Sequence, residues 1–154
     1  ERGDDSHSGA RVKEHAVNTL TVLLGADAAF DERVAYDLEW LPRVLPAALL
    51  DRHAAVVVAA SRFVRRLSEV GAAAESINVD NSTSLIPGGP HARHLVLNDD
   101  LFEAMLRRYE RCEDVPIRVH LLCALSNAAA DPRVQFCMAR CQRLLQLLLD
   151  EVFN

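Results

Sequence analysis

The chain has 154 residues, of which half are hydrophobic and a quarter charged, and its formal net charge is −5. This length is enough for one domain with a sizeable core, and the composition is that of a folded globular protein. The acidic balance argues against a general nucleic-acid binder, which needs a basic surface. No apolar run approaches the ~20 residues that a membrane span requires, so no membrane association is expected.

The first residues and the cysteines bear on where the protein works. The start, ERGDDSHSGA, contains no Met and no apolar segment, so we expect a fragment of a longer protein without a signal peptide. The four cysteines, at positions 112, 123, 137 and 141, fall mostly within apolar helical pattern. This favours buried thiols in a reducing compartment over a disulfide framework. We therefore expect an intracellular protein, cytoplasmic or alternatively nuclear.

Helical periodicity accounts for most of the first half of the chain. Residues 1–10 are polar and predict a disordered tail. Apolar positions recur at helical spacing over 11–25. Asp31 is expected to cap a second helix, which Pro42 and Pro46 make kinked or two-piece before it ends near residue 50. Residues 51–70 predict the next helix, with Asp51 as its N-cap.

The second half begins with the long Gly-, Ser-, Asn- and Pro-containing stretch 71–97, which predicts an inserted loop. Helices resume at Asn98, a candidate N-cap. Residues 115–131 are apolar around most of the circumference, so this helix is expected to be enclosed between neighbours. A last helix over 132–152 ends in LLQLLLDEVF, which is apolar almost all round and predicts a further neighbour.

The helical segments repeat. The segment 101–106 resembles 144–149, and residues 15–24 resemble 120–129 in their placing of apolar and small residues. The same pattern fits 54–63. The unit is one apolar helix, a turn and a flatter helix, with the long loop inserted in the middle copy. All-helical units of about 40 residues are typical of armadillo or HEAT solenoids.

The clearest family resemblance lies in residues 121–151, LLCALSNAAADPRVQFCMARCQRLLQLLLDE. In armadillo repeats a third helix carries a small-residue segment, ALSNLA, which is followed by a turn and then by GAIPALVRLL. Here ALSNAA at 124–129 matches the first segment, and 141–149 approximates the second. The resemblance implies an all-α fold, a right-handed α-solenoid of about three armadillo-like repeats over residues 11–154. It also implies a concave groove that binds a peptide or helix of another protein.

One asparagine stands out within this segment. In the armadillo family the Asn lies on the concave face and hydrogen-bonds the main chain of an extended peptide, and by resemblance that role falls on Asn127. A helix places Pro116, His120 and Cys123 on the same stripe, which predicts a groove floor. The alternative is that Asn127 bonds to a neighbouring turn inside the stack.

Two groups of arginines project from predicted helices: Arg62, Arg65 and Arg66, and Arg107, Arg108 and Arg111. Guanidinium groups that face the groove would form bidentate pairs with carboxylates of an acidic peptide, and we count Arg62 and Arg66 among the candidate binding residues. The alternative is that each group only keeps its helix solvated.

Neither catalysis nor a metal site is expected. Cys137 and Cys141 are spaced by four residues and lack the C-x2-C knuckle that structural zinc usually requires. The sequence contains no Gly-rich phosphate loop, no G-x-S-x-G and no H-E-x-x-H. We therefore expect a non-enzymatic protein without a cofactor.

The alternative function is a structural or assembly module. In this interpretation the apolar C-terminal helix mediates self-association, through Leu145, Leu148 and Val152, and the protein forms a homodimer.

Overall fold

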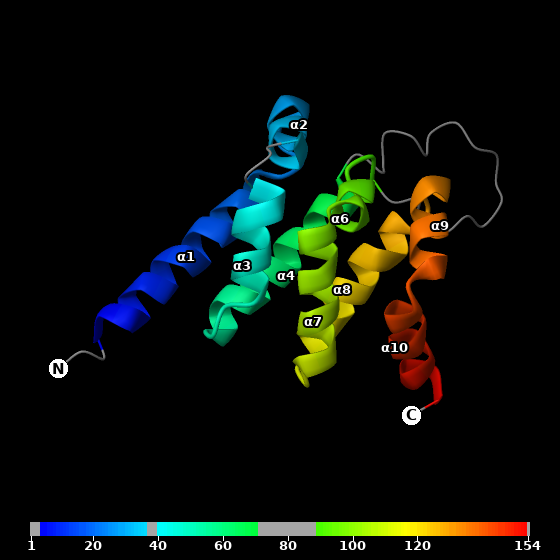
Figure 1. Ribbon diagram of the computed structural model, residues 1–154. Coiled ribbons are helices and arrows are strands. Elements are labelled where there is room, and N and C mark those ends of the chain that lie inside the picture. The colour runs from blue at the N-terminus through cyan, green and yellow to red at the C-terminus, as the bar shows by residue number, and fades with distance from the viewer. Residues whose placement is uncertain (1–3, 37–39, 71–88, 154) are drawn as a thin grey trace.

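The computed structural model describes residues 4–36, 40–70 and 89–153, and these residues form helices without any strand. The three longest helices, α1 (Asp4–Leu23), α4 (Ala54–Glu69) and α8 (Val115–Ala128), make one row in which α4 packs between α1 and α8 (Figure 1). The prediction of an all-α protein is confirmed.

A second row of helices covers the first. Its members are η1 (Trp40–Val44, a single π-helical turn), α3 (Leu45–Leu49), α7 (Asp99–Arg111) and α10 (Gln142–Phe153). Three more helices lie beside this row: α2 (Ala28–Tyr36), α6 (Arg93–Leu97) and α9 (Pro132–Arg140). Within this row α3 packs on α7. The order along the chain recurs, because α2 and α3 precede α4 just as α6 and α7 precede α8 (Figure 1).

The core is centred on α4. Phe63, Val64 and Leu67 on this helix have no exposed surface, because α1 covers one side of the helix and α8 the other. The prediction that the 115–131 helix is the enclosed one is wrong. Only one side of α8 packs against its neighbours, and on the other side Val115 and Val119 are 64% and 44% exposed.

Side-chain caps begin several helices. Asn98 Oδ1 accepts a hydrogen bond from the Leu101 N–H at 3.0 Å, as expected from the sequence. Asp114 and Asp131 cap α8 and α9 in the same way. These bonds satisfy backbone N–H groups that a helix start leaves without an intrahelical partner.

Two other aspartates do not act as predicted. Asp31, expected to open the second helix, lies buried in the first turn of α2, where its Oδ1 accepts from the Gly25 N–H at 2.9 Å. Asp51 precedes the true N-cap, His53, and accepts from the His53 N–H at 2.9 Å. Both carboxylates stabilise the chain before a helix and not the first turn itself.

Helix boundaries differ from the sequence expectation at both ends of the chain. The first helix starts at Asp4, within the stretch 1–10 expected to be a tail, because Ala10 is buried and the His7 ring lies 6.1 Å from the His53 ring. The last predicted helix is interrupted at Cys141, whose backbone is extended, so that α9 and α10 are separate.

The predicted loop 71–97 is described only in its last part, since residues 71–88 lie outside the described residues. From Gly89 the chain turns into α6, and the Gly89 N–H donates to the Ser68 carbonyl at 2.8 Å. A Cβ at Gly89 would lie 1.9 Å from the Val70 carbonyl oxygen. Only glycine permits this close approach.

Candidate partner-binding face

The solvent side of α4 adjoins the edge of α8 that carries the predicted stripe. Because α4 buries the opposite side of its circumference in the core, its charged residues share the outer side. We define the α4–α8 face by the residues that line it: Arg62, Arg65 and Glu69 on α4, and Pro116, His120, Cys123 and Asn127 on α8.

Direct contacts join the two helices across this face. The Arg65 Nη1 lies 3.5 Å from the His120 Nδ1. Further along both helices, the Asn127 amide donates from Nδ2 to the Ser68 hydroxyl at 2.9 Å. Ser68 is buried, and its hydroxyl donates to the Arg65 carbonyl at 2.6 Å. The structure therefore brings the predicted α8 stripe beside the first group of arginines.

The bond to Ser68 gives Asn127 the packing role that the sequence analysis held as the alternative. It does not use up the amide, which has a second N–H and a carbonyl oxygen with two lone pairs. Asn127 is half-buried, so part of its side chain reaches the surface. The same residue is thus fixed in orientation by α4 and still presents both donor and acceptor capacity to a partner.

The surroundings of His120 favour its neutral form. Burial lowers its pKa, and the nearby guanidinium groups of Arg65 and Arg62 lower it further. A guanidinium group only donates hydrogen bonds, so Nδ1 of His120 is the acceptor toward Arg65. The remaining ring nitrogen, Nε2, then carries the proton and is a hydrogen-bond donor.

Two arginines have structural contacts that the sequence did not reveal. Arg66 donates from Nε and Nη2 to the Leu24 carbonyl at 3.4 and 3.2 Å, which fastens the end of α1 to α4. Gly25, with φ of 87°, makes room for it, because a Cβ there would lie 2.7 Å from Arg66 Nη2. Arg108 of α7 donates to the Leu49 and Asp51 carbonyls at 2.6 and 3.1 Å.

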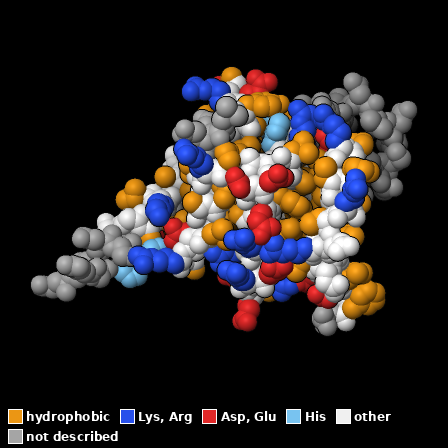
Figure 2. All heavy atoms as spheres, viewed as in Figure 1, with side chains coloured by type: hydrophobic (Ala, Val, Ile, Leu, Met, Phe, Trp, Pro, Cys, Tyr) orange, Lys and Arg blue, Asp and Glu red, His pale blue; other side chains and the backbone are white. Residues whose placement is uncertain are grey.

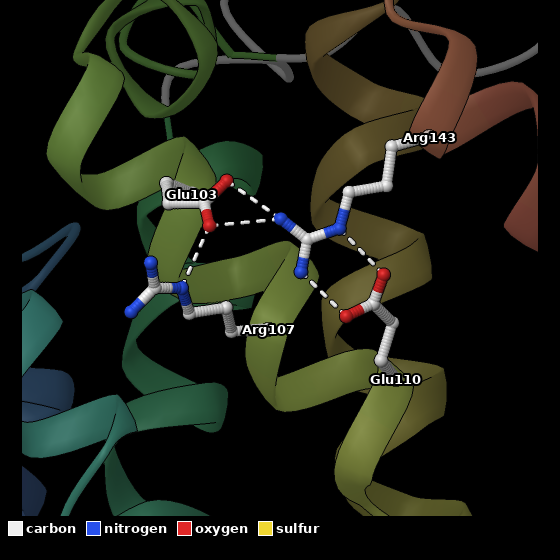
Figure 3. Close-up of polar contacts among 4 residues, drawn as sticks. All are labelled: Glu103, Arg107, Glu110 and Arg143. Atoms are coloured by element: carbon white, nitrogen blue, oxygen red, sulfur yellow. Dashed lines mark hydrogen bonds and ion pairs between the residues drawn. The ribbon is translucent and has the colours of Figure 1, made fainter.

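The second group of arginines belongs to α7 in the other row and not to the α4–α8 face. There Arg107 pairs with Glu103 at 2.7 Å. Figure 2 shows basic and acidic side chains interleaved near the centre of that surface. The central residue of this charged cluster is Arg143 of α10. Its guanidinium contacts Glu103 at 2.7 Å and Glu110 at 2.5 Å (Figure 3). This cluster holds α10 against α7.

A pair of histidines lies at the junction of α2 and α6. His91 and His94 each have one buried ring nitrogen, Nδ1 and Nε2 respectively, without a hydrogen-bond partner. The Tyr36 ring meets both, with centroids 6.3 and 4.7 Å away. His94 also lines a cavity of about 220 Å³, together with Ala35, Tyr36, Leu41, Pro42, Leu97 and Asn98. Among the described residues no group of three or more His, Cys, Asp or Glu side chains is placed to hold a metal ion.

The cysteines are free thiols, and Cys112, Cys123 and Cys141 are half-buried. The expectation of burial is wrong for Cys137, which is exposed. On α9 the positions that turn inward are Val134 and Met138, and Cys137 lies on the other side of the helix.

An apolar strip runs along the outer side of α10. Leu145 and Val152 are 43% and 75% exposed, and Leu149 and Phe153 extend the strip. Leu148, which the sequence analysis grouped with them, instead packs against the core. The available self-association surface is therefore narrower than expected.

Comparisons of the chain with protein-family models, with curated proteins and with solved structures find no match. Within the described part of the chain, no helix has both the length and the apolar character to cross a membrane. The functional interpretation therefore depends on the residues of the chain itself.

Proposed function

We propose that this chain is a non-enzymatic interaction module of armadillo-like helical repeats, which holds a segment of another protein along the α4–α8 face. Support comes from the recurring order of helices, in which α4 and α8 each follow a pair of other helices (α2 and α3, α6 and α7) and lie beside the previous long helix. In solenoids each repeat buries its apolar side only by stacking on its neighbours, and the stack presents one extended surface.

The observation that carries the proposal is the position of Asn127. Its amide is held by Ser68 of the neighbouring long helix, is half-buried, and retains a donor and an acceptor. Main-chain groups of an extended segment require hydrogen-bond partners when they lose water. An oriented amide meets that need at a small entropic cost, because its rotamer is already fixed.

The test separates the binding role of Asn127 from its packing role. Peptides that bind the chain are selected from a random library, and their Kd is measured for the wild type, Asn127→Ala and Ser68→Ala. Both variants lose the bond between the two side chains, so both lose about 1 kcal/mol of folding free energy. We expect Asn127→Ala to weaken peptide binding by about tenfold, and Ser68→Ala to weaken it less, because that variant keeps the amide and only frees its rotamer. If peptides bind Asn127→Ala as well as the wild type, the proposed face is wrong.

A second candidate is self-association through α10. The observation in its favour is the exposed apolar strip that contains Leu145 and Val152. Contiguous apolar surface of this kind marks interaction sites more often than it remains in contact with water. In this case a second copy of the chain would cover the strip.

A further inference from the structure

We infer that the segment held on the α4–α8 face is acidic, with Asp or Glu side chains that pair with Arg62 and its neighbours on α4. This inference rests on the proposed function and adds the chemical class of the partner.

The charge of α4 is opposite in sign to that of the whole chain. The whole chain is acidic, with 22 Asp and Glu against 17 Lys and Arg. Helix α4 carries the opposite balance, since its charged residues are Arg62, Arg65, Arg66 and Glu69. On α8 the charged residue is Arg118, which pairs with Glu151 of α10. The α4–α8 face itself carries Arg62 and Arg65 against Glu69, so it has a net positive charge on a protein that is acidic overall.

Two of the three arginines of α4 already have partners within the molecule. Arg65 pairs with Glu69 at 2.7 Å, and Arg66 donates to the Leu24 carbonyl. Arg62 is exposed and forms no ion pair with any described residue. It also lies near enough to His120 to act on that ring electrostatically. Arg62 lies on the same helix as Ser68, six residues before it, so its exposed guanidinium adds charge to the directional bonding that Asn127 offers.

The hydrogen-bond donors of this face suit carboxylate groups. A guanidinium group forms two parallel hydrogen bonds with one carboxylate, which adds orientation to attraction. The Nε2–H of His120 is a further donor on the same face. A basic segment would meet Arg62 and Arg65 with like charge, which costs affinity and excludes such partners.

The experiment compares three labelled flexible peptides of equal length and pattern, in which every second residue is Glu, Gln or Lys. Binding to ¹⁵N-labelled protein is followed by NMR titration at low and at physiological salt, for the wild type, Arg62→Glu and Arg111→Glu. Arg111 is the matched control because it is exposed on α7, away from the face, and its reversal changes the net charge equally. Arg62→Gln serves as a second variant if Arg62→Glu perturbs the fold.

We expect the Glu peptide to bind best, to shift amide signals of α4 and α8, and to lose about tenfold in affinity with Arg62→Glu. Arg111→Glu should leave its Kd within about twofold, and added salt should weaken the complex. An equal loss of affinity in Arg62→Glu and Arg111→Glu would show that the Glu peptide is attracted by net charge and does not bind at a defined site. That result would overturn the inference. So would a Glu peptide that does not bind.

The two proposals fail in different ways. If the Gln peptide binds as tightly as the Glu peptide and Asn127→Ala weakens both, the binding face stands and the acidic partner is wrong. If Arg62→Glu weakens the Glu peptide and Asn127→Ala does not, the acidic preference stands and the role of Asn127 is wrong.

Discussion

Three histidines lie in surroundings that favour the neutral form of the ring. Burial lowers the pKa of His91, His94 and His120 below the usual 6.5, and the nearest guanidinium group, Arg93 for His94 and Arg65 for His120, acts in the same direction. Asp31 and Glu32 oppose the shift at His91. Near and below pH 6.5 the unfolded chain therefore binds more protons than the folded one. The stability from these groups is present above pH 6.5 and lost as the pH falls through the folded pKa values.

We predict that the free energy of unfolding, measured by urea at pH 7.5 and at 5.5, falls on acidification. His94→Gln should reduce this fall, because a residue that cannot take up a proton contributes nothing to the slope. The contribution of one proton is at most about 1.4 kcal/mol per pH unit. His15→Gln, at an exposed site on α1, is the matched control for the replacement of a histidine. A His94→Gln slope equal to that of the wild type would contradict the prediction.

The success of sequence analysis at single residues depends on how local each contact is. Asn98 was identifiable as a cap because its partner, Leu101, lies three residues away. Arg66 and Arg108 bond to carbonyls 42 and 59 residues away, and no spacing in the sequence points to those partners. Asn127 lies between these cases, because the family resemblance marked the residue but Ser68 was not foreseeable.

At the scale of elements, α10 is attached to the rest of the molecule by apolar contacts and by charge. Leu144 is its buried residue, whereas Arg143 joins two glutamates of α7 and Glu151 pairs with Arg118 of α8. The hydrogen bonds from Arg143 lower the pKa of both Glu103 and Glu110. The stability that they provide is therefore present above the usual pKa of 4.5 and lost in more acidic solution.

We predict that Arg143→Ala loosens α10 without unfolding α4. The cost should be about 1 kcal/mol, because the pairs are partly exposed and screened by solvent. Hydrogen exchange followed by mass spectrometry should show faster exchange in 142–153 and unchanged exchange in 54–69. Arg107→Ala removes only a pair within α7 and serves as control. Unchanged exchange in 142–153 of Arg143→Ala would show that apolar contacts alone hold the helix.

The position of α10 also explains why the last two helices were predicted as one. Residues 132–152 contain no internal Gly or Pro, so no local signal marks a break. The chain turns at Cys141 because Arg143 and Leu144 find their partners on other helices. Tertiary contacts decide this boundary, and the propensities of the single segment do not contain that information.

At the scale of the whole molecule, helical periodicity was sufficient to predict the all-α class. Periodicity could not identify the central helix. Residues 115–128 are apolar around most of their circumference, but α4 is the helix with a long neighbour on each side. Burial depends on what packs nearby, and composition alone does not report it. The armadillo-like assignment and the handedness of the stack remain predictions.

Self-association is a property of the whole molecule, and the exposed strip of α10 makes it testable. If this strip is an interface, the solution mass from light scattering should rise over a tenfold range of concentration. The double variant Leu145→Glu and Val152→Glu should remain a monomer, because charge at an apolar interface is costly. Val22→Glu, at an 80% exposed position on α1, is the control. A wild type that is monomeric throughout would rule this candidate out.

Ser68 has one further consequence, which concerns how the protein tolerates change in length. Its carbonyl binds the Gly89 N–H, so the chain leaves α4 and returns to the same place. The entropic cost of closing such a connection depends only weakly on its length, since each doubling of loop length costs only about 0.6 kcal/mol. A change in the length of the connection between residues 70 and 89 is therefore expected to cost little, whereas a side chain at Gly89 would displace the Val70 carbonyl.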